Sequence, residues 1–299
     1  MKSGYSLIYS LQILTNLLVR NTYRITKVTT FADDNYIIKC NKEKKIALEE
    51  LGRELEKIIK WLKGSGLKVN ESKTELCIFH RSNNTDGSLL VDNVLIKSKD
   101  EINVLGITFD SKLQWGLQVS RTIRGANTSL QAIKLIRKYF TTPEIVQLLT
   151  SNFYSRFYYG SEIWHIPTLN RNCKKMLLSA SANALKLCNI FYDPFVSYID
   201  LHKLHKRALP SKFCIYRHCL LLHKVFNDSI PRNDWLNLNF QIITTSRQTT
   251  FEVQNRSTYK VGNNILSNRL ACINKKIPLN MLNLDIGPYK VNCKNMFLI

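Results

Sequence analysis

No apolar run in the 299-residue sequence reaches the roughly 18 to 20 residues that a membrane-spanning helix needs. The longest apolar stretch near the start, residues 5–19, is interrupted by Gln12, Thr15 and Asn16. This stretch faintly imitates a signal peptide, but no small-x-small cleavage site follows it. We therefore expect a protein that neither spans a membrane nor is secreted.

Cysteine shows no regular spacing, since the eight cysteines are scattered along the whole chain. Such a pattern is typical of reduced thiols and excludes the disulfide framework of a small secreted domain. We expect an intracellular protein, in the cytoplasm or the nucleus. Hydrophobic residues make up 44% of the chain and charged residues 22%, which excludes a largely disordered protein.

Acidic residues are scarce, because 22 Asp and Glu stand against 43 Lys and Arg. Residues 1–110 hold 17 basic and 14 acidic side chains, whereas residues 111–299 hold 26 basic and 8 acidic ones. The excess positive charge therefore belongs to the second segment. A basic surface can serve solubility alone, but this imbalance favours a polyanion partner, and nucleic acid first.

The first 110 residues have the periodicity of strands and one helix. Residues 25–30 and 36–40, rich in β-branched and aromatic residues, are predicted to form two short strands around the polar tetrad 32–35, and hence a hairpin. Apolar residues spaced alternately by three and four over residues 48–62 predict an amphipathic helix that ends at the glycines of residues 64–66. Further strands are predicted at residues 76–79, 89–91, 94–96 and 102–109.

Beyond residue 110 the apolar period changes from 2 to 3.6, which indicates helices. We expect one long helix or a helix pair over residues 113–138, and a helix capped by Thr142 with Pro143 at its first position. Two more helices are expected at residues 175–188 and 211–226. The fold class is therefore α+β, with antiparallel strands and one helix followed by a mainly helical region. We make no structural prediction for residues 227–299.

Asp33 and Asp34 are the sharpest chemical feature of the sequence. Adjacent carboxylates in a regular strand point to opposite faces, so only a tight turn lets both approach one site. Two carboxylates held together repel each other unless a cation neutralises them, and such a pair, if buried, calls for Mg²⁺. Ions of this kind activate an attacking hydroxyl and stabilise a leaving phosphate. The alternative is a solvated turn, because turns favour aspartate.

Four motifs in order resemble the reverse transcriptase of non-LTR, LINE-like retrotransposons. The resemblance is strong over residues 25–115 and looser at residues 199–203 and 206–210. The four motifs are Phe31-Ala32-Asp33-Asp34, the helix ending at Trp61-Leu62, the string Gly66-Leu67-Lys68-Val69-Asn70-Glu71-Ser72-Lys73-Thr74, and Val104-Leu105-Gly106-Ile107-Thr108-Phe109-Asp110 with Leu113 and Trp115.

The resemblance implies RNA-directed DNA synthesis, a nucleotidyl transfer from a deoxynucleotide to a DNA primer on an RNA template. It makes Asp33 and Asp34 a pair that binds Mg²⁺ or Mn²⁺, with Asp33 the more direct ligand. Lys73 would lie near the phosphates of the incoming nucleotide, on a turn shaped by Asn70 and Thr74. Judged without the resemblance, Lys73 is an ordinary solvated loop lysine.

The resemblance also implies residues that contact the substrate strands. Phe31 and Ala32 would contact substrate beside the aspartate pair. Leu105 and Gly106 would belong to a strand pair that grips the primer end, although they fit equally well as a core residue and a bulge.

The resemblance divides the chain into three parts: a partial palm at residues 1–110, a helical thumb-like segment at 111–170, and a basic helical region at 171–299. A palm of this kind needs a third carboxylate on a strand upstream of the aspartate pair, and residues 1–24 contain no acidic residue. The Pro-Gln-Gly-Ser segment that selects nucleotides in the family is absent too. We expect the C-terminal part of such an enzyme, inactive by itself, with a non-catalytic nucleic-acid-binding remnant as the alternative.

Two smaller groups of residues have ordinary structural explanations. Two Cys-His pairs lie within residues 214–223, but roughly 140° of rotation about a helix separates them, so core cysteines and surface histidines are expected rather than a zinc site. An aromatic group over residues 153–164 has helical spacing, which favours core packing over stacking on bases. The residues of these groups are Cys214, His218, Cys219 and His223, and Phe153, Tyr154, Phe157, Tyr158, Tyr159 and Trp164.

Overall fold

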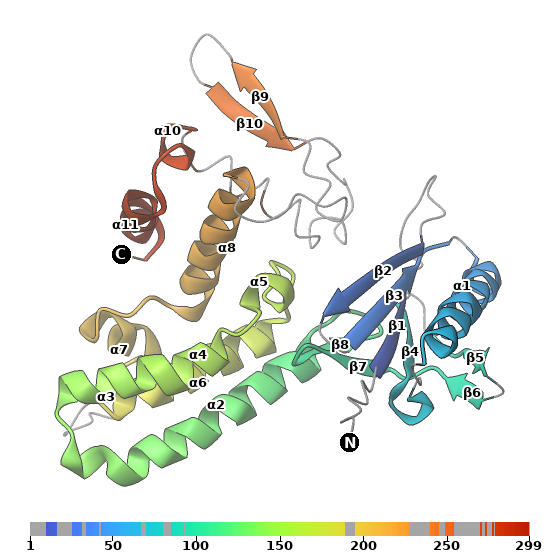
Figure 1. Ribbon diagram of the computed structural model, residues 1–299. Coiled ribbons are helices and arrows are strands. Elements are labelled where there is room, and N and C mark those ends of the chain that lie inside the picture. Colours follow the sequence, from blue (N-terminus) through green and yellow to red (C-terminus); the bar gives the residue numbers. More distant parts are fainter. Residues whose placement is uncertain are drawn as a thin grey trace, which may run out of the picture. The chain divides into compact units, whose positions relative to one another are not determined.

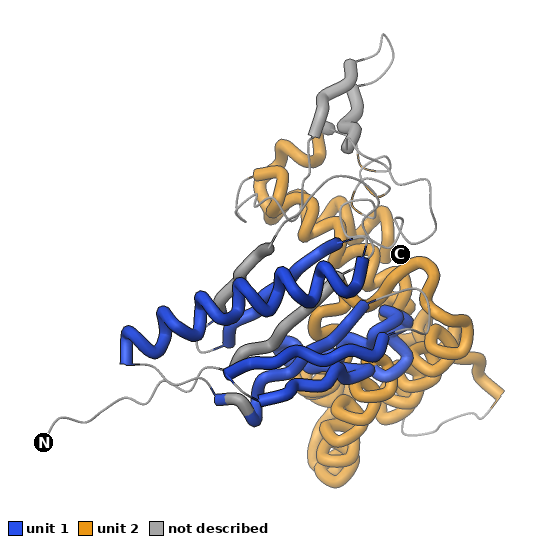
Figure 2. The backbone as a smooth tube through the Cα atoms, turned by 90° about the vertical axis from the view of Figure 1, so that its right-hand side faces the viewer, with its two compact units in different colours: residues 1–117 blue, residues 118–299 orange. Residues whose placement is uncertain are grey.

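The computed structural model contains two compact units, residues 1–117 and 118–299 (Figure 2). The α+β prediction is confirmed, because strands dominate the first 110 residues and helices dominate residues 116–226. The predicted division into a partial palm, a thumb-like segment and a basic region, with boundaries at residues 110 and 170, stays a prediction. The structure describes residues 10–16, 26–31, 34–41, 43–66, 70–79, 85–92, 94–188, 195–227, 240–244, 249–253, 270, 273, 277 and 279–298.

The first unit is built on a four-stranded sheet of β1 (Ser10–Asn16), β2 (Thr26–Phe31), β3 (Asp34–Lys39) and β4 (Glu75–Phe79) (Figure 1). The strand order is β2-β3-β1-β4. β2 and β3 form the predicted antiparallel hairpin, whereas β1 runs parallel to both β3 and β4. The sequence did not predict β1, so the sheet is mixed rather than purely antiparallel.

Helix α1 (Lys44–Gly64) covers this sheet, as its apolar period predicted. Its buried side chains include Leu51, Leu55 and Leu62, which pack with Ile37 of β3 and Leu76 of β4. Burying each of these side chains stabilises the fold by about 1.5–3 kcal/mol. The helix ends before Gly66, whose φ of 74° is accessible to glycine without strain.

A second hairpin, β5 (Ser88–Val91) and β6 (Val94–Lys97), closes the helix-covered core. Leu89, Val91 and Ile96 are buried in this core, and the two strands lie where the sequence predicted them.

The predicted single strand over residues 102–109 is wrong. The segment forms a hairpin of β7 (Glu101–Val104) and β8 (Ile107–Asp110) instead. Leu105 and Gly106 have φ angles of 48° and 78°, so the chain reverses between them in a two-residue turn. Two consecutive positive φ angles are the mark of the tight hairpin turn that suits twisted strands.

Asp110 anchors the chain segment that leads from the β7–β8 hairpin to the second long helix. Its carboxylate accepts backbone hydrogen bonds from Lys112, Gln114 and Trp115 at 3.2, 2.9 and 2.7 Å. The next helix, α2 (Gly116–Ile136), is continuous, which decides between the one-helix and two-helix alternatives.

The second unit continues with α3 (Thr142–Leu148), which starts one residue earlier than predicted. Thr141, not Thr142, is the N-cap, because its backbone N–H and hydroxyl both donate to Glu144 at 2.7 Å. These hydrogen bonds lower the pKa of Glu144. A π-helix, η3 (Leu149–Tyr154), and the short α4 (Ser155–Phe157) follow.

The aromatic residues of this region form a core, as the spacing predicted. The rings of Phe153 and Phe157 stack with centroids 5.2 Å apart. Phe153, Phe157 and Trp164 are completely buried, and Tyr158 is nearly so, whereas Tyr159 is 53% exposed. Trp164 belongs to α5 (Ser161–Trp164). These buried rings are therefore unavailable for stacking on bases.

A buried polar chain links this core to α6 (Arg171–Lys186) and α7 (Tyr198–Leu204). The Tyr154 hydroxyl lies 3.3 Å from the Ser181 hydroxyl, which lies 3.0 Å from Nε2 of His202. Nδ1 of His202 donates to the Tyr198 carbonyl at 2.6 Å, so Nε2 accepts from Ser181. Burial lowers the pKa of His202, and the neutral ring satisfies both partners.

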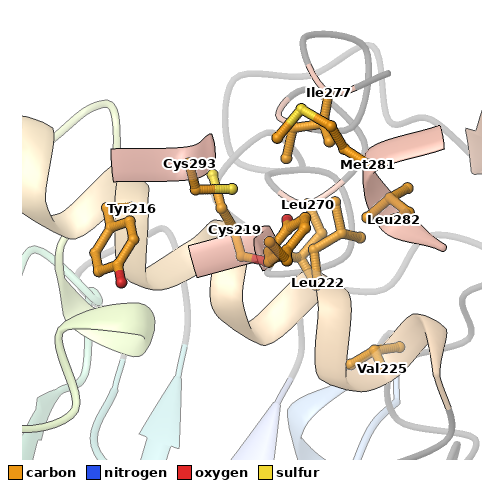
Figure 3. Packing of buried hydrophobic residues seen from close by; sticks show 10 residues of the cluster. Tyr216, Cys219, Leu222, Val225, Leu270, Ile277, Met281, Leu282 and Cys293 are labelled. Atoms are coloured by element: carbon orange, nitrogen blue, oxygen red, sulfur yellow. The ribbon is translucent and has the colours of Figure 1, made fainter. Parts of the chain in front are cut away.

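A separate apolar core surrounds α8 (Pro210–Phe226) near the end of the chain. Helices α10 (Leu279–Leu282) and α11 (Ile286–Phe297) contribute to it, and β9 (Phe240–Thr244) pairs with β10 (Thr249–Val253) in an antiparallel hairpin. None of the described helices is long and apolar enough to cross a membrane. The core residues drawn and labelled in Figure 3 include Tyr216, Cys219, Leu222, Val225, Leu270, Ile277, Met281, Leu282 and Cys293.

The cysteines of α8 are buried as expected, but the expectation of surface histidines is wrong. His218 and His223 are only 4% and 5% exposed. Nδ1 of His218 lies 2.7 Å from the Cys214 carbonyl, and Nε2 of His223 lies 2.8 Å from the Leu284 carbonyl. These backbone partners explain how buried imidazoles are tolerated. Within the described part of the chain, no three His, Cys, Asp or Glu residues gather as metal ligands.

Candidate active site

Asp34, the second residue of the predicted aspartate pair, lies at one end of the β2–β3 strand pair. Asp34 is the first residue of β3 and pairs with Phe31, the last residue of β2. Asp34 is half-buried, Phe31 is 61% exposed, and the Tyr36 hydroxyl donates to the Asp34 carboxylate at 3.1 Å. The predicted site residues Ala32 and Asp33 lie outside the described residues.

The strand next to Asp34 brings no acidic side chain. β1 lies beside β3, with Ser10 in register with Asp34. The sequence of β1, Ser-Leu-Gln-Ile-Leu-Thr-Asn, contains neither aspartate nor glutamate. In a two-metal mechanism, one divalent ion binds the attacking oxygen and the other binds the leaving oxygen. Holding both ions requires carboxylates from more than one strand. The described residues therefore do not complete a two-ion site, in keeping with the absence of a three-ligand cluster among them.

Lys73 stands on a short ordered turn immediately before β4. It ends the 3₁₀-helix η1 (Glu71–Lys73), and its backbone N–H donates to the Asn70 carbonyl at 3.2 Å. The Thr74 hydroxyl donates to the same carbonyl at 3.0 Å, and Thr74 is buried. Asn70 and Thr74 thus fix the turn, while the side chain of Lys73 is exposed. The ammonium group is available to an anionic ligand.

Leu105 and Gly106 are neither a core residue nor a bulge, because they form the tip of the β7–β8 hairpin. Leu105 is 40% exposed. The hairpin is held against the four-stranded sheet, because Ile102 of β7 packs with Cys77 and Phe79 of β4. An apolar side chain is thereby presented on a rigid support at the edge of the sheet unit.

Sequence reasoning missed β1, the strand that lies between β3 and β4. The only signal for it is weak: Leu11 and Ile13 alternate with the polar Ser10 and Gln12, but the apolar Leu14 breaks this period of two.

Residues 8–109 match the model of the family described as reverse transcriptase (RNA-dependent DNA polymerase). Neither the curated proteins nor the solved structures give a match. The matched range contains β1, the Asp34 hairpin, α1, the Lys73 turn and the Leu105 turn. Residues 8–109, about a third of the chain, are therefore similar to the reverse transcriptase family.

Proposed function

We propose that the chain acts in the RNA-directed DNA synthesis of a non-LTR retrotransposon. In this proposal it supplies the second half of a polymerase palm and the helical thumb that hold an RNA template and a DNA primer. The observation that carries it is the Asp34 hairpin packed under α1 within a segment of the reverse transcriptase family. The four ordered motifs support the retrotransposon context, and two of their residues, Asp34 and Lys73, lie on ordered turns or strand ends.

Nucleic-acid binding is the part of this function that the helical residues support. Helices α2 and α6 contain Arg and Lys but no acidic residue. Acid-free basic helices create a positive potential that attracts the phosphate backbone. Binding of template and primer is therefore the role assigned to residues 111–299.

A non-catalytic nucleic-acid-binding protein derived from such an element is the second candidate. It is favoured by one observation, the absence of acidic residues from β1 beside Asp34. The two candidates share nucleic-acid binding and differ in polymerisation.

We expect the full chain to bind a primer–template with an affinity that falls steeply with salt. The reason is counterion release, which gives a slope of log affinity against log salt of about −0.9 for each phosphate contacted in B-form DNA. Fluorescence anisotropy of a labelled primer–template across a salt series measures the slope. A chain that bound no primer–template at low salt, or bound it equally well at all salt concentrations, would refute the proposed role.

We expect Asp33 and Asp34 to bind a single divalent ion weakly. A carboxylate pair attracts such an ion, but among the described residues no third acidic, histidine or cysteine ligand joins it to hold the ion tightly. In a Mn²⁺ titration followed by NMR, paramagnetic broadening should centre on hairpin residues such as Phe31 and Tyr36. The double variant Asp33→Asn/Asp34→Asn should abolish it, while Asp86→Asn, an exposed aspartate outside the hairpin, should not. Broadening centred elsewhere would contradict the assignment.

A further inference from the structure

A groove of about 450 Å³ lies between α2 and α6, wholly within residues 118–299. Figure 1 shows the two helices running alongside each other. Neither the family match nor the aspartate hairpin involves this groove, because both belong to the first unit. Its lining residues include Ile123, Asn127, Asn172, Lys175, Met176 and Asn183.

The polar lining of the groove is concentrated on one face of α6. At 100° per residue, Asn172, Lys175 and Asn183 fall within a sector of about 80°. All three are exposed, and so is Asn127 on the opposite wall. Within the described part of the chain, neither the Lys175 ammonium nor these three amide side chains have a hydrogen-bond partner. Their donors and acceptors are therefore available to a ligand.

Lys175 is the charged side chain among the lining residues, and the two helices that form the groove are basic. Helix α2 carries Arg121, Arg124 and Lys134, and α6 carries four Lys and Arg residues, with no Asp or Glu on either helix. An excess of positive charge on the helices around a cleft attracts ligands of the opposite sign. The charge around the groove therefore favours an anionic ligand.

The uncharged lining residues restrict the chemical class of the ligand further. Ile123 and the thioether of Met176 offer apolar contact, and sulfur contacts aromatic rings favourably. Asparagine amides carry a donor and an acceptor side by side, which matches the edge of a nucleobase. A simple phosphate would use the lysine and leave the amides and the apolar surface without a role.

We propose that the α2–α6 groove binds one or two nucleotides of a single-stranded nucleic acid, with Lys175 on a phosphate and the asparagine amides on base edges. The inference rests on the proposed function, since both require a nucleic-acid ligand. The volume of the groove falls in the range of small-ligand sites, about 300–1,000 Å³, which suits unpaired nucleotides rather than a duplex. Unpaired bases also expose the edges that amides read.

The test uses the full chain and a short labelled oligonucleotide of one sequence, as RNA and as DNA. Replacing Lys175 by methionine should weaken binding of both about fivefold to tenfold and reduce the magnitude of the salt slope by about 0.7, the value for one phosphate of a single strand. The matched control is Lys224→Met, which removes an exposed lysine from the last turn of α8 outside the groove. It should leave the slope unchanged.

A second variant separates base contacts from charge. Asn127→Ala/Asn183→Ala should weaken oligonucleotide binding about tenfold at an unchanged salt slope, and should not change binding of inorganic polyphosphate, which has no bases. If the unmodified chain bound no oligonucleotide, the proposed function would fail. If it bound and the Lys175→Met variant behaved like Lys224→Met, or if the asparagine variant bound as before, the groove assignment alone would fail.

Discussion

The purified chain, given an RNA template, a DNA primer, deoxynucleotides and Mg²⁺ or Mn²⁺, is expected to show no primer extension above that of its Asp33→Asn/Asp34→Asn variant. β1 lies beside Asp34 and contains no acidic residue, and no three-ligand cluster is present in the part of the chain that the structure describes. Losing one set of ligands removes several kcal/mol of transition-state stabilisation, and each 1.36 kcal/mol is tenfold in rate. The rate should therefore be lower than that of a complete site by roughly three orders of magnitude or more.

Primer extension on a denaturing gel, with a known reverse transcriptase as positive control, measures this directly. Extension by the unmodified chain that disappears in the aspartate variant would contradict the expectation. It would show that a carboxylate from another part of the chain, such as Asp110, or from a second copy, completes the site. The nucleic-acid-binding candidate would then lose its main support.

Replacing Phe157 by alanine is expected to destabilise the second unit by about 3–5 kcal/mol. Phe157 is completely buried and stacks on Phe153, so its removal leaves a cavity in the aromatic core. Urea unfolding followed by circular dichroism measures the loss, because residues 118–227 are mainly helical.

The matched control is Tyr159→Ala, two residues further along the chain. Tyr159 is 53% exposed, and the Trp164 indole donates to its backbone carbonyl, which the substitution retains. We expect this variant to lose about 1 kcal/mol or less. Equal losses for the two variants would show that the aromatic group is not a packed core. A loss of nucleic-acid binding in Phe157→Ala at full stability would favour base stacking instead.

The sequence predicted those elements whose periodicity is long or whose turn chemistry is explicit. α1 has five apolar residues on one face, and the β2–β3 hairpin surrounds a polar tetrad, so both were confirmed with nearly the predicted bounds. The segment at residues 102–109 was misread because Leu105 adopts a positive φ that a leucine rarely takes. Pairing of β7 with β8, and packing of Ile102 against Cys77 and Phe79 of β4, stabilise that turn.

The candidate site was predictable in its residue types and only partly in its arrangement. The hairpin position of Asp34 and the turn around Lys73 follow from local sequence, because neighbouring residues form both. The place of β1 between β3 and β4 depends on pairing across long stretches of chain, which no local pattern encodes. The α2–α6 groove was equally hidden, since it arises only when two helices distant in sequence lie together.

At the turn formed by Leu105, the residue that presents an apolar side chain to a ligand is also one that destabilises the hairpin. A left-handed conformation costs a residue with a β-carbon about 1–2 kcal/mol, and glycine or asparagine would form the same turn more easily. The chain instead has a leucine that is 40% exposed, at the tip of a hairpin whose base is fixed to β4. If Leu105 contacts the primer, as the resemblance implies, replacing this residue should change folding stability and primer affinity in opposite directions. Asparagine or glycine at position 105 would stabilise the hairpin and weaken binding of the primer.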